Sequence, residues 1–213
     1  MLDIIILAIL AYFIFKKLKS ILGDEYDKDY FGYDEKTHQF VYKKRMKDAD
    51  KVEAKEEIGS KDYNNLDEKS KKYAIELCEK IGGFSLSKFK FIVEKVCDAV
   101  IKANENHNEK EIKTFFATEL ADAIISGFQN EEQNHIALVA IDKIEIDNID
   151  KDGEKYIICM KINTQQINYT TDRDNRIVDG SKTEIIKVSE KWFFSRKISS
   201  KNQTWFIEKI EEC

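Results

Sequence analysis

The amino-acid sequence predicts an α+β fold, in which helices pack on a curved four-stranded antiparallel sheet behind an N-terminal transmembrane helix and a charged tether. Apolar residues recur at helical spacing from residue 66 to residue 128. From His135 onward the period changes to two, and β-branched and aromatic residues dominate. Because helices come first and strands afterward, we expect hairpin-connected strands with helices covering one face.

Residues 1–23 are predicted to be a single-pass membrane anchor. The uninterrupted apolar run from Ile4 to Phe15 would span only about 18 Å of the roughly 30 Å hydrocarbon layer, but its flanks extend the helix to about 33 Å. A buried core helix, an interfacial helix and a signal peptide are the alternatives. The side chains expected to face lipid are Leu2, Ile4, Ile5, Ile6, Leu7, Ile9, Leu10, Phe13, Ile14 and Phe15.

The charges that flank this run predict its orientation. Asp3 precedes it and three lysines follow it, whereas a secretory signal carries its positive charges first. Because lysines mark the cytoplasmic side of a membrane helix, we expect the N-terminus to face out and the rest of the chain to be cytoplasmic at the inner membrane. The topology-setting lysines are Lys16, Lys17 and Lys19.

Residues 24–65 are predicted to be a charged flexible tether, because acidic and basic residues alternate there with few aliphatics and no sustained period. A basic cluster from Lys43 to Lys47 would add weak contact with anionic lipid near the membrane surface. The folded domain is expected to occupy residues 66–213.

Three helical stretches open this domain. Residues 66–81 read as an amphipathic lead-in helix that stops at two glycines. Ser85 is the expected N-cap of a helix over residues 85–104, with Phe84 and Phe89 in the positions of a hydrophobic staple. Asn108, followed three residues later by Glu111, predicts the start of one further helical stretch that reaches residue 128.

Four strands are expected after these helices, near residues 136–147, 154–170, 182–197 and 203–211. Turn signals at residues 151–153, 179–180 and 199–202 separate them, so consecutive strands should form a meander. In the third strand, Ile186, Val188, Trp192 and Phe194 share one face, which predicts that this face is dry.

Composition and spacing argue against several function classes. The net charge is −5, and the 35 basic residues do not gather in one arm, which argues against nucleic acid. The cysteines form no CxxC pair and the three histidines have no metal-ligand spacing, so we expect neither a metal nor a cofactor. The sequence offers no Ser/His/Asp or Cys/His arrangement, so no catalytic residue is assigned.

The segment from Phe84 to Glu211 resembles a known family. Its helical part reads FSLSKFKFIVEKVCDAVIKANENHNEKEIKTFFATELADAIISGF, and its last part reads RIVDGSKTEIIKVSEKWFFSRKISSKNQTWFIEKI. In this order of elements the chain is similar to the C-terminal domain of the forty-four-kilodalton subunit of the mitochondrial inner-membrane translocase. Its N-terminal anchor resembles that of the short bacterial, membrane-anchored relatives of that subunit.

That resemblance implies a cone like that of nuclear transport factor two, in which helices and a strongly curved sheet enclose an apolar cavity. It also implies a membrane-tethered, lipid-associated adaptor or scaffold that binds proteins or apolar segments, in protein translocation or in the handling of membrane proteins. The expected partners are the inner membrane and membrane or translocation proteins. The mitochondrial subunit has a long chaperone-contacting region where this chain has a short tether, which puts chaperone recruitment in doubt.

A hypothetical cavity in this cone would be lined by Phe89, Val93, Ile186, Trp192 and Phe194. Core packing explains the two aromatic residues of the third strand at least as well as ligand contact does. The alternative function is a small-ligand-binding or enzymatic domain, in which the carboxylate of Glu190 would act from the same strand face. The residues favour a binding domain over an enzyme.

Overall fold

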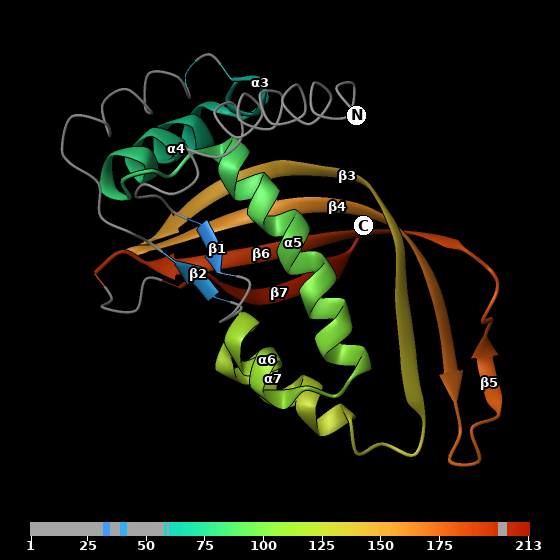
Figure 1. Ribbon diagram of the computed structural model, residues 1–213. Helices are drawn as coiled ribbons and strands as arrows, with labels where there is room; N and C mark the ends of the chain where they lie inside the picture. The colour runs from blue at the N-terminus through green and yellow to red at the C-terminus, as the bar shows by residue number, and fades with distance from the viewer. Residues whose placement is uncertain (1–31, 35–38, 42–57, 59, 200–203) are drawn as a thin grey trace, which may run out of the picture.

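The computed structural model in Figure 1 describes residues 32–34, 39–41, 58, 60–199 and 204–213. Its helices are α3 (Lys61–Asn64), α4 (Glu68–Lys80), α5 (Leu86–Glu105), α6 (Glu109–Phe115) and α7 (Thr118–Gly127). A small antiparallel sheet pairs β1 (Gly32–Asp34) with β2 (Gln39–Val41). The large sheet contains β3 (Gln133–Asp152), β4 (Lys155–Thr171), β5 (Ile177–Gly180), β6 (Ile186–Lys197) and β7 (Phe206–Glu212).

The predicted α+β order is confirmed, because helices α4 to α7 precede the large antiparallel sheet. The strand order is β3-β4-β6-β7, with β5 paired to β4 beyond the start of β6. Helix α5 crosses in front of the strands, α4 lies at one of its ends, and α6 and α7 lie at the other (Figure 1). The helices therefore cover one face of a curved sheet.

The predicted start of α5 is confirmed in detail. The Ser85 hydroxyl accepts a hydrogen bond from the backbone N–H of Lys88, at 3.2 Å. The rings of Phe84 and Phe89 lie 5.8 Å apart, which is the contact expected of a hydrophobic staple. This local signal fixes the angle at which the chain enters the helix that covers the sheet.

The single helix predicted from residue 108 to residue 128 is wrong, because the chain breaks at Phe116 into α6 and α7. Phe116 is extended, with φ −103° and ψ 147°, and bridges Ile207 of β7 in parallel. The backbone N–H of Ala117 donates to the carbonyl of Ile207 at 2.9 Å. Pairing with the sheet edge replaces helical hydrogen bonds here, and no local residue pattern encodes such a long-range contact.

The β3–β4 hairpin turns at Gly153 and Glu154, which confirms the predicted turn. Gly153 has φ +58°, a value that glycine adopts without a steric penalty. The pairing register then shifts three times, so Val139, Asp142 and Asp147 of β3 have no partner on β4. Such bulges bend and twist a strand, and they account for the curvature of this edge.

The sheet has five strands where four were predicted. Residues 177–180, which include the predicted Asp-Gly turn, form the strand β5, and β6 begins only at Ile186. Gly180 has φ +72°, and a Cβ on it would lie 2.3 Å from the carbonyl oxygen of Asn168. The glycine therefore serves a close approach of two strands and not a hairpin turn.

Part of the segment predicted as a tether, residues 24–65, is ordered in secondary structure. It contains β1, β2 and α3. Helix α3 is joined to α5 by an ion pair between Asp62 and Lys90 at 2.8 Å, and Tyr63 packs against the core. One of the charged residues that predict a solvated tether, Asp62, thus forms an ion pair with the folded domain.

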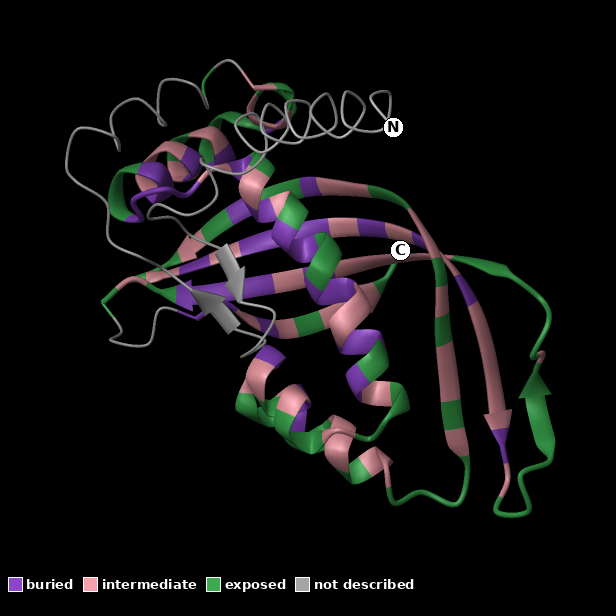
Figure 2. Ribbon diagram, in the orientation of Figure 1, coloured by how far each residue is buried: buried purple, intermediate pink, exposed green. Residues whose placement is uncertain are grey.

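Burial divides the helix-facing side of the sheet into two ends (Figure 2). At the closed end, near the β3–β4 turn, the side chains are almost fully buried, among them Phe84, Phe89, Tyr156, Ile158, Phe194 and Trp205. At the open end, apolar side chains of α7 and of the first half of β3 are only half buried, namely Leu120, Ile124, Ile125, Phe128, Ile136, Leu138 and Ile141. The sheet beyond the helices, residues 133–141, 166–171 and 177–180, is called the arm below.

The predicted anchor, residues 1–23, lies outside the described residues. In the part of the chain that the structure does describe, no helix is long and apolar enough to span a membrane.

Candidate functional site

Four of the five predicted cavity residues come together at and beside the closed end. Phe89 and Val93 of α5 are fully buried, as is Phe194, and Trp192 is 3% exposed. The ring centroid of Phe89 lies 5.5 Å from that of Phe194 and 5.0 Å from that of Trp205. These rings pack edge to face or tilted, as aromatic residues do in cores. Contact of this cluster with a ligand stays a prediction.

Ile186 does not join this cluster. It lies at the first position of β6 and is 39% exposed. Its Cα is paired with that of Gln166, in the arm. The predicted strand face is correct, since Ile186 alternates in register with Trp192 and Phe194. The sheet extends past its helices there, however, so the side chain loses its cover.

A row of polar side chains continues the helix-facing side of β4 beyond Ile162 and into the arm. Thr164 and Gln166 are 2% and 4% exposed, and the side-chain amide of Gln166 donates to the hydroxyl of Thr164 at 2.8 Å. The side-chain oxygen of Asn168, next in the row, is buried and has no hydrogen-bond partner among the described residues. Because a buried acceptor without a donor is costly, this row is suited to a neutral hydrogen-bonding group.

Glu190 of β6 lies beside this polar row, because its Cα is paired with that of Ile162. The indole N–H of Trp192 donates to a Glu190 carboxylate oxygen at 3.0 Å, which orients the carboxylate along the strand. Burial, and then the nearby Glu190 charge, raise the pKa of the Cys97 thiol to about 12. The Cys97 thiol therefore stays protonated and unreactive at neutral pH.

Aliphatic side chains border the polar row on the side of β3. Ile136, Leu138 and Ile141 are paired with Asn168, Gln166 and Thr164, respectively. Helix α7 presents its own half-buried stripe toward the core, made of Leu120, Ile124, Ile125 and Phe128. The open end thus combines apolar borders with a neutral polar floor, and its apolar side chains remain partly in contact with water.

The C-terminus of α5 holds the arm in place. Nδ1 of His135 lies 3.1 Å from one oxygen of Glu105, and the backbone N–H of Ile136 donates to the other at 3.3 Å. Nε2 of the same histidine lies 3.0 Å from the hydroxyl of Thr171, and its ring stacks on Tyr169 with centroids 4.5 Å apart. One carboxylate thereby ties a helix end to two strands of the arm.

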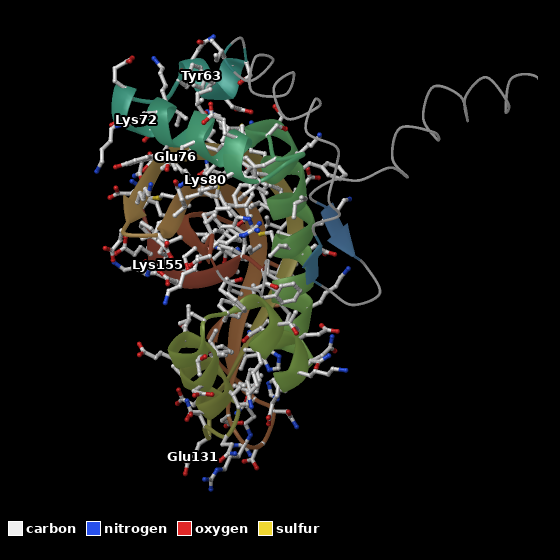
Figure 3. All side chains as sticks on the ribbon, turned by 90° about the vertical axis from the view of Figure 1, so that its left-hand side faces the viewer. Tyr63, Lys72, Glu76, Lys80, Glu131 and Lys155 are labelled. Atoms are coloured by element: carbon white, nitrogen blue, oxygen red, sulfur yellow. The ribbon has the colours of Figure 1, made fainter. Side chains whose placement is uncertain are left out.

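A charged cluster fastens α4 to the β3–β4 hairpin at the opposite end of the molecule. The Glu76 carboxylate accepts from Lys151 at 2.6 Å and from Lys80 at 2.7 Å, and Lys80 also donates to the Tyr156 hydroxyl at 3.2 Å. These hydrogen bonds, first that from Lys151, lower the pKa of Glu76 to about 2. Figure 3 shows Glu76 and Lys80 together on α4, far from Glu131.

Two open cavities lie at the surface of the domain. One, of about 430 Å³, lies between α6, α7 and β7 and is lined by Lys113, Phe116, Ala117, Thr118, Ala121, Asp122 and Phe206. The other, of about 500 Å³, lies at the β3–β4 turn and is lined by Asp152, Glu154, Lys155, Lys197 and Ser199. Among the described residues no three His, Cys, Asp or Glu side chains are grouped so that they could hold a metal ion.

The polar row and the Glu105 contact were not predicted from the sequence. The polar row could have been predicted, because the residues on one face of this strand change from apolar to polar between Ile162 and Thr164. The Glu105 contact could not, since Glu105 and His135 are separated by two helices and a turn.

Comparison with known proteins places the domain in a family. Residues 76–212 match the family described as the Tim44-like domain. No curated protein is significantly similar in sequence. A solved structure, the intermembrane space region of the chloroplast protein ARC6, aligns with 58% of this chain and 95% of its own, at 12% identity and a TM-score of 0.37.

The family match contains the last five residues of α4 and all of α5, α6, α7 and the large sheet. It confirms the resemblance expected from residues 84–211. Because the match extends over well more than half of the chain, the chain belongs to the Tim44-like domain family.

Proposed function

We propose that this protein is a membrane-tethered adaptor whose open end binds an apolar segment of a protein partner. The observation that carries the proposal is the set of half-buried aliphatic side chains of α7 and β3 at that end. Burying their remaining surface against a partner would contribute roughly 25 cal/mol per Å² of apolar area. The open end therefore has the partly exposed apolar surface expected of a binding site for a protein partner.

The polar floor supports a peptide-like occupant. A peptide carries neutral N–H groups along its backbone. The side-chain oxygen of Asn168 is buried and has no donor among the described residues, so a bound peptide N–H would satisfy it once the side chain turns toward the surface. Thr164 and Gln166 continue the row with neutral groups. An apolar segment whose side chains contact the aliphatic borders could place its backbone along this row.

The wider role that we propose is a scaffold in protein translocation or in the handling of membrane proteins, with the domain acting as a cone whose mouth is the open end. Membership of the Tim44-like family supports this role. The helix-covered, curved sheet supports the cone. The aliphatic borders support a client segment that is itself apolar.

The binding test compares two neighbouring residues of α7. Ile124 is half buried and packs toward the core, whereas Ala123 is exposed. Binding of a fluorescent apolar peptide flanked by lysines, measured by anisotropy with the full chain in detergent, should weaken about tenfold or more in Ile124→Asp. Ala123→Asp introduces the same charge one position away and should bind as the parent does.

Melting curves followed by circular dichroism establish that both variants are folded. Equal weakening by the two substitutions, or no peptide binding by the parent protein at about 100 μM, where even a weak specific site would be occupied, would rule out the open end as the binding site.

The proposed role is binding and not catalysis, and Glu190 tests this distinction. Its carboxylate is oriented by the Trp192 indole and lies beside the polar floor, so it is the group that an enzymatic alternative would use. Glu190→Gln retains an acceptor for the indole N–H. We expect peptide binding and cellular function to survive this change; loss of function with binding intact would favour the enzyme.

We also propose that residues 1–23 anchor the chain in the inner membrane and that the domain faces the cytoplasm, because the lysines follow the apolar run. Cys213 offers a direct test, since it is exposed while Cys78, Cys97 and Cys159 are buried. A membrane-impermeant maleimide should label Cys213 in inside-out vesicles and not in intact spheroplasts. Labelling in spheroplasts, or release of the protein by carbonate, contradicts the topology or the anchor, respectively.

A further inference from the structure

The open end has two apolar walls, α7 and the first half of β3, and both are fastened to the C-terminal end of α5. Glu105 holds β3 through His135 and the backbone of Ile136. Two residues further along the chain, the ring of His107 stacks on that of Phe128, the C-cap of α7, with centroids 4.5 Å apart. Figure 1 shows α7 and the arm on either side of this end of α5. Because each wall has its own contact with α5, one wall can be released without the other.

The other end of α7 has the backbone of a hinge. Phe116 and Ala117 are both extended, with ψ of 147° and 148°, between two helices. Phe116 is itself anchored, because it is 3% exposed and bridges Ile207 of β7. Ala117 is the N-cap of α7, and no side-chain hydrogen bond caps the helix there. A few residues at the end of an element can absorb the rotation of a helix, so α7 starts from a fixed point about which it can turn.

Between its two ends, α7 is held mainly by half-buried apolar side chains. Ala121 is the one buried residue among its ten, whereas nine of the twenty residues of α5 are buried. In the part of the chain that the structure describes, the polar side chains of α7 form no hydrogen bond or ion pair with another element. The Ser126 hydroxyl, for example, donates to the carbonyl of Asp122 within the helix. An element with so few buried contacts opens locally at a low free energy.

We propose that α7 is a hinged gate of the open end and that His107 is the positioning residue that holds it closed. When the His107–Phe128 stack separates, α7 turns about Phe116 and Ala117 and moves away from β3. An apolar segment then enters between the two walls and contacts the apolar stripe of α7. The proposal rests on the binding proposed above, and it adds how the site is opened.

His107 is suited to this task because α5, and not α7, fixes its position. Its φ is +49°, and the backbone N–H of Asn108 donates to the carbonyl of Ala103 at 2.8 Å, which ends α5 in a left-handed turn. The His107 residue is exposed, so separating its ring from that of Phe128 uncovers little buried surface. The stack therefore favours the closed gate, and a binding segment can still open it.

Hydrogen exchange of the full chain in detergent tests the gate without a ligand. The amides of α7 should exchange about tenfold or more faster than those in the middle of α5, because they open locally. His107→Asn removes the ring and keeps a residue that tolerates φ +49°, so exchange in α7 should rise by about a further threefold. Lys110→Asn changes an exposed residue of α6 and is the matched control, which should leave exchange in α7 as in the parent.

The rate of peptide association shows whether opening admits the segment. With the fluorescent apolar peptide of the binding test, the association rate should rise about threefold in His107→Asn, because a larger fraction of the chains is open. A substitution that merely destabilised the site would not speed association. Lys110→Asn should associate at the rate of the parent.

A cross-link that holds the gate closed tests the opposite direction. In a Cys213→Ser background the remaining native cysteines are buried, so a bifunctional maleimide can link His107→Cys to Phe128→Cys. Linking should lower the association rate about tenfold or more, because the open state is lost. The same double variant capped with a monofunctional maleimide is the control and should bind at the rate seen before capping.

Three results would overturn the gate. One is exchange in α7 that is as slow as in the middle of α5. Another is an association rate that neither His107→Asn nor the cross-link changes, which would leave the binding site in place without its gate. The third is an equal effect of His107→Asn and Lys110→Asn. Absence of peptide binding by the parent would instead refute the proposed function, and exchange in α7 would then decide by itself whether this helix opens.

Discussion

The closed and open ends of the domain are built on the same helix and the same strands, yet they differ in what fills them. At the closed end Phe89 contacts Phe84, Phe194 and Trp205, and all four side chains are fully buried. At the open end the helix-facing side of β4 becomes polar, and the aliphatics that border it are half buried. One sheet thus supports a fully buried core at one end and a partly exposed apolar surface at the other.

This difference separates stability from binding. Fully buried aromatics make the largest contributions to the free energy of unfolding, whereas half-buried aliphatics retain apolar area for a partner. Because the closed end holds the fold, the open end can carry polar and exposed groups that would weaken a core. Changes at the closed end should therefore act mainly on stability, and changes at the open end mainly on binding and local opening.

The largest effect is expected from Phe89→Ala. This change removes a fully buried ring and its three aromatic contacts, so the free energy of unfolding should fall by about 3–5 kcal/mol. Phe91, two residues along α5, is 51% exposed, and Phe91→Ala should cost less than about 1 kcal/mol. Urea unfolding of the two variants measures both values, and equal losses would contradict the assignment of Phe89 to the core of the closed end.

The second effect concerns the arm. In Gly180→Ala the new Cβ would lie 2.3 Å from the Asn168 carbonyl oxygen at φ +72°, so one strand must shift, and we expect a loss of roughly 2–4 kcal/mol. Gly153→Ala at φ +58° meets nothing within 4 Å and should lose only about 1–2 kcal/mol. If thermal unfolding shows Gly153→Ala to be the more damaging change, the strand contact at Gly180 is unimportant.

The third effect is the pH dependence of the closed end. Hydrogen bonds from Lys151 and Lys80 lower the pKa of Glu76 from 4.5 to about 2, so its contribution to stability is complete above pH 4.5 and is lost as the pH falls toward 2. Glu76→Gln should cost about 1–2 kcal/mol at pH 7, and this difference from the parent should shrink steadily between pH 4.5 and 2.

Urea unfolding at pH 7, 4 and 3 measures the Glu76 difference. Glu79→Gln on the exposed side of α4 is the control and should match the parent throughout. A pH-independent difference between Glu76→Gln and the parent would contradict the role of the carboxylate charge.

Local signals carried much of the fold. The Ser85 cap, the Phe84–Phe89 staple, the Gly153 turn and the alternation along β4 and β6 are encoded by neighbouring residues, and each could be read before the structure was known. The break at Phe116 could not, because the carbonyl of Ile207, which accepts the hydrogen bond from the Ala117 N–H, lies far along the chain.

The candidate site was less predictable for a related reason. Alternation correctly placed Ile186 on the face of Trp192, but the sequence does not state where the covering helices end, so its exposure was missed. The sequence predicts a turn where β5 lies, because an Asp-Gly pair usually marks one. Gly180 is instead needed because the backbone of Asn168 passes close to it, and this approach exists only after the sheet has formed.

The smallest effect on global stability, and the sharpest test of the open end, concerns Glu105. Its carboxylate ties α5 to His135 and Ile136, but it is 40% exposed, so Glu105→Ala should cost less than about 1 kcal/mol in urea. The amide of Ile136 and its neighbours in the arm should nevertheless exchange with deuterium several-fold faster, because they open locally. Exposed Glu94 on the same helix is the control. Uniformly faster exchange across both ends would mean that they unfold as one unit.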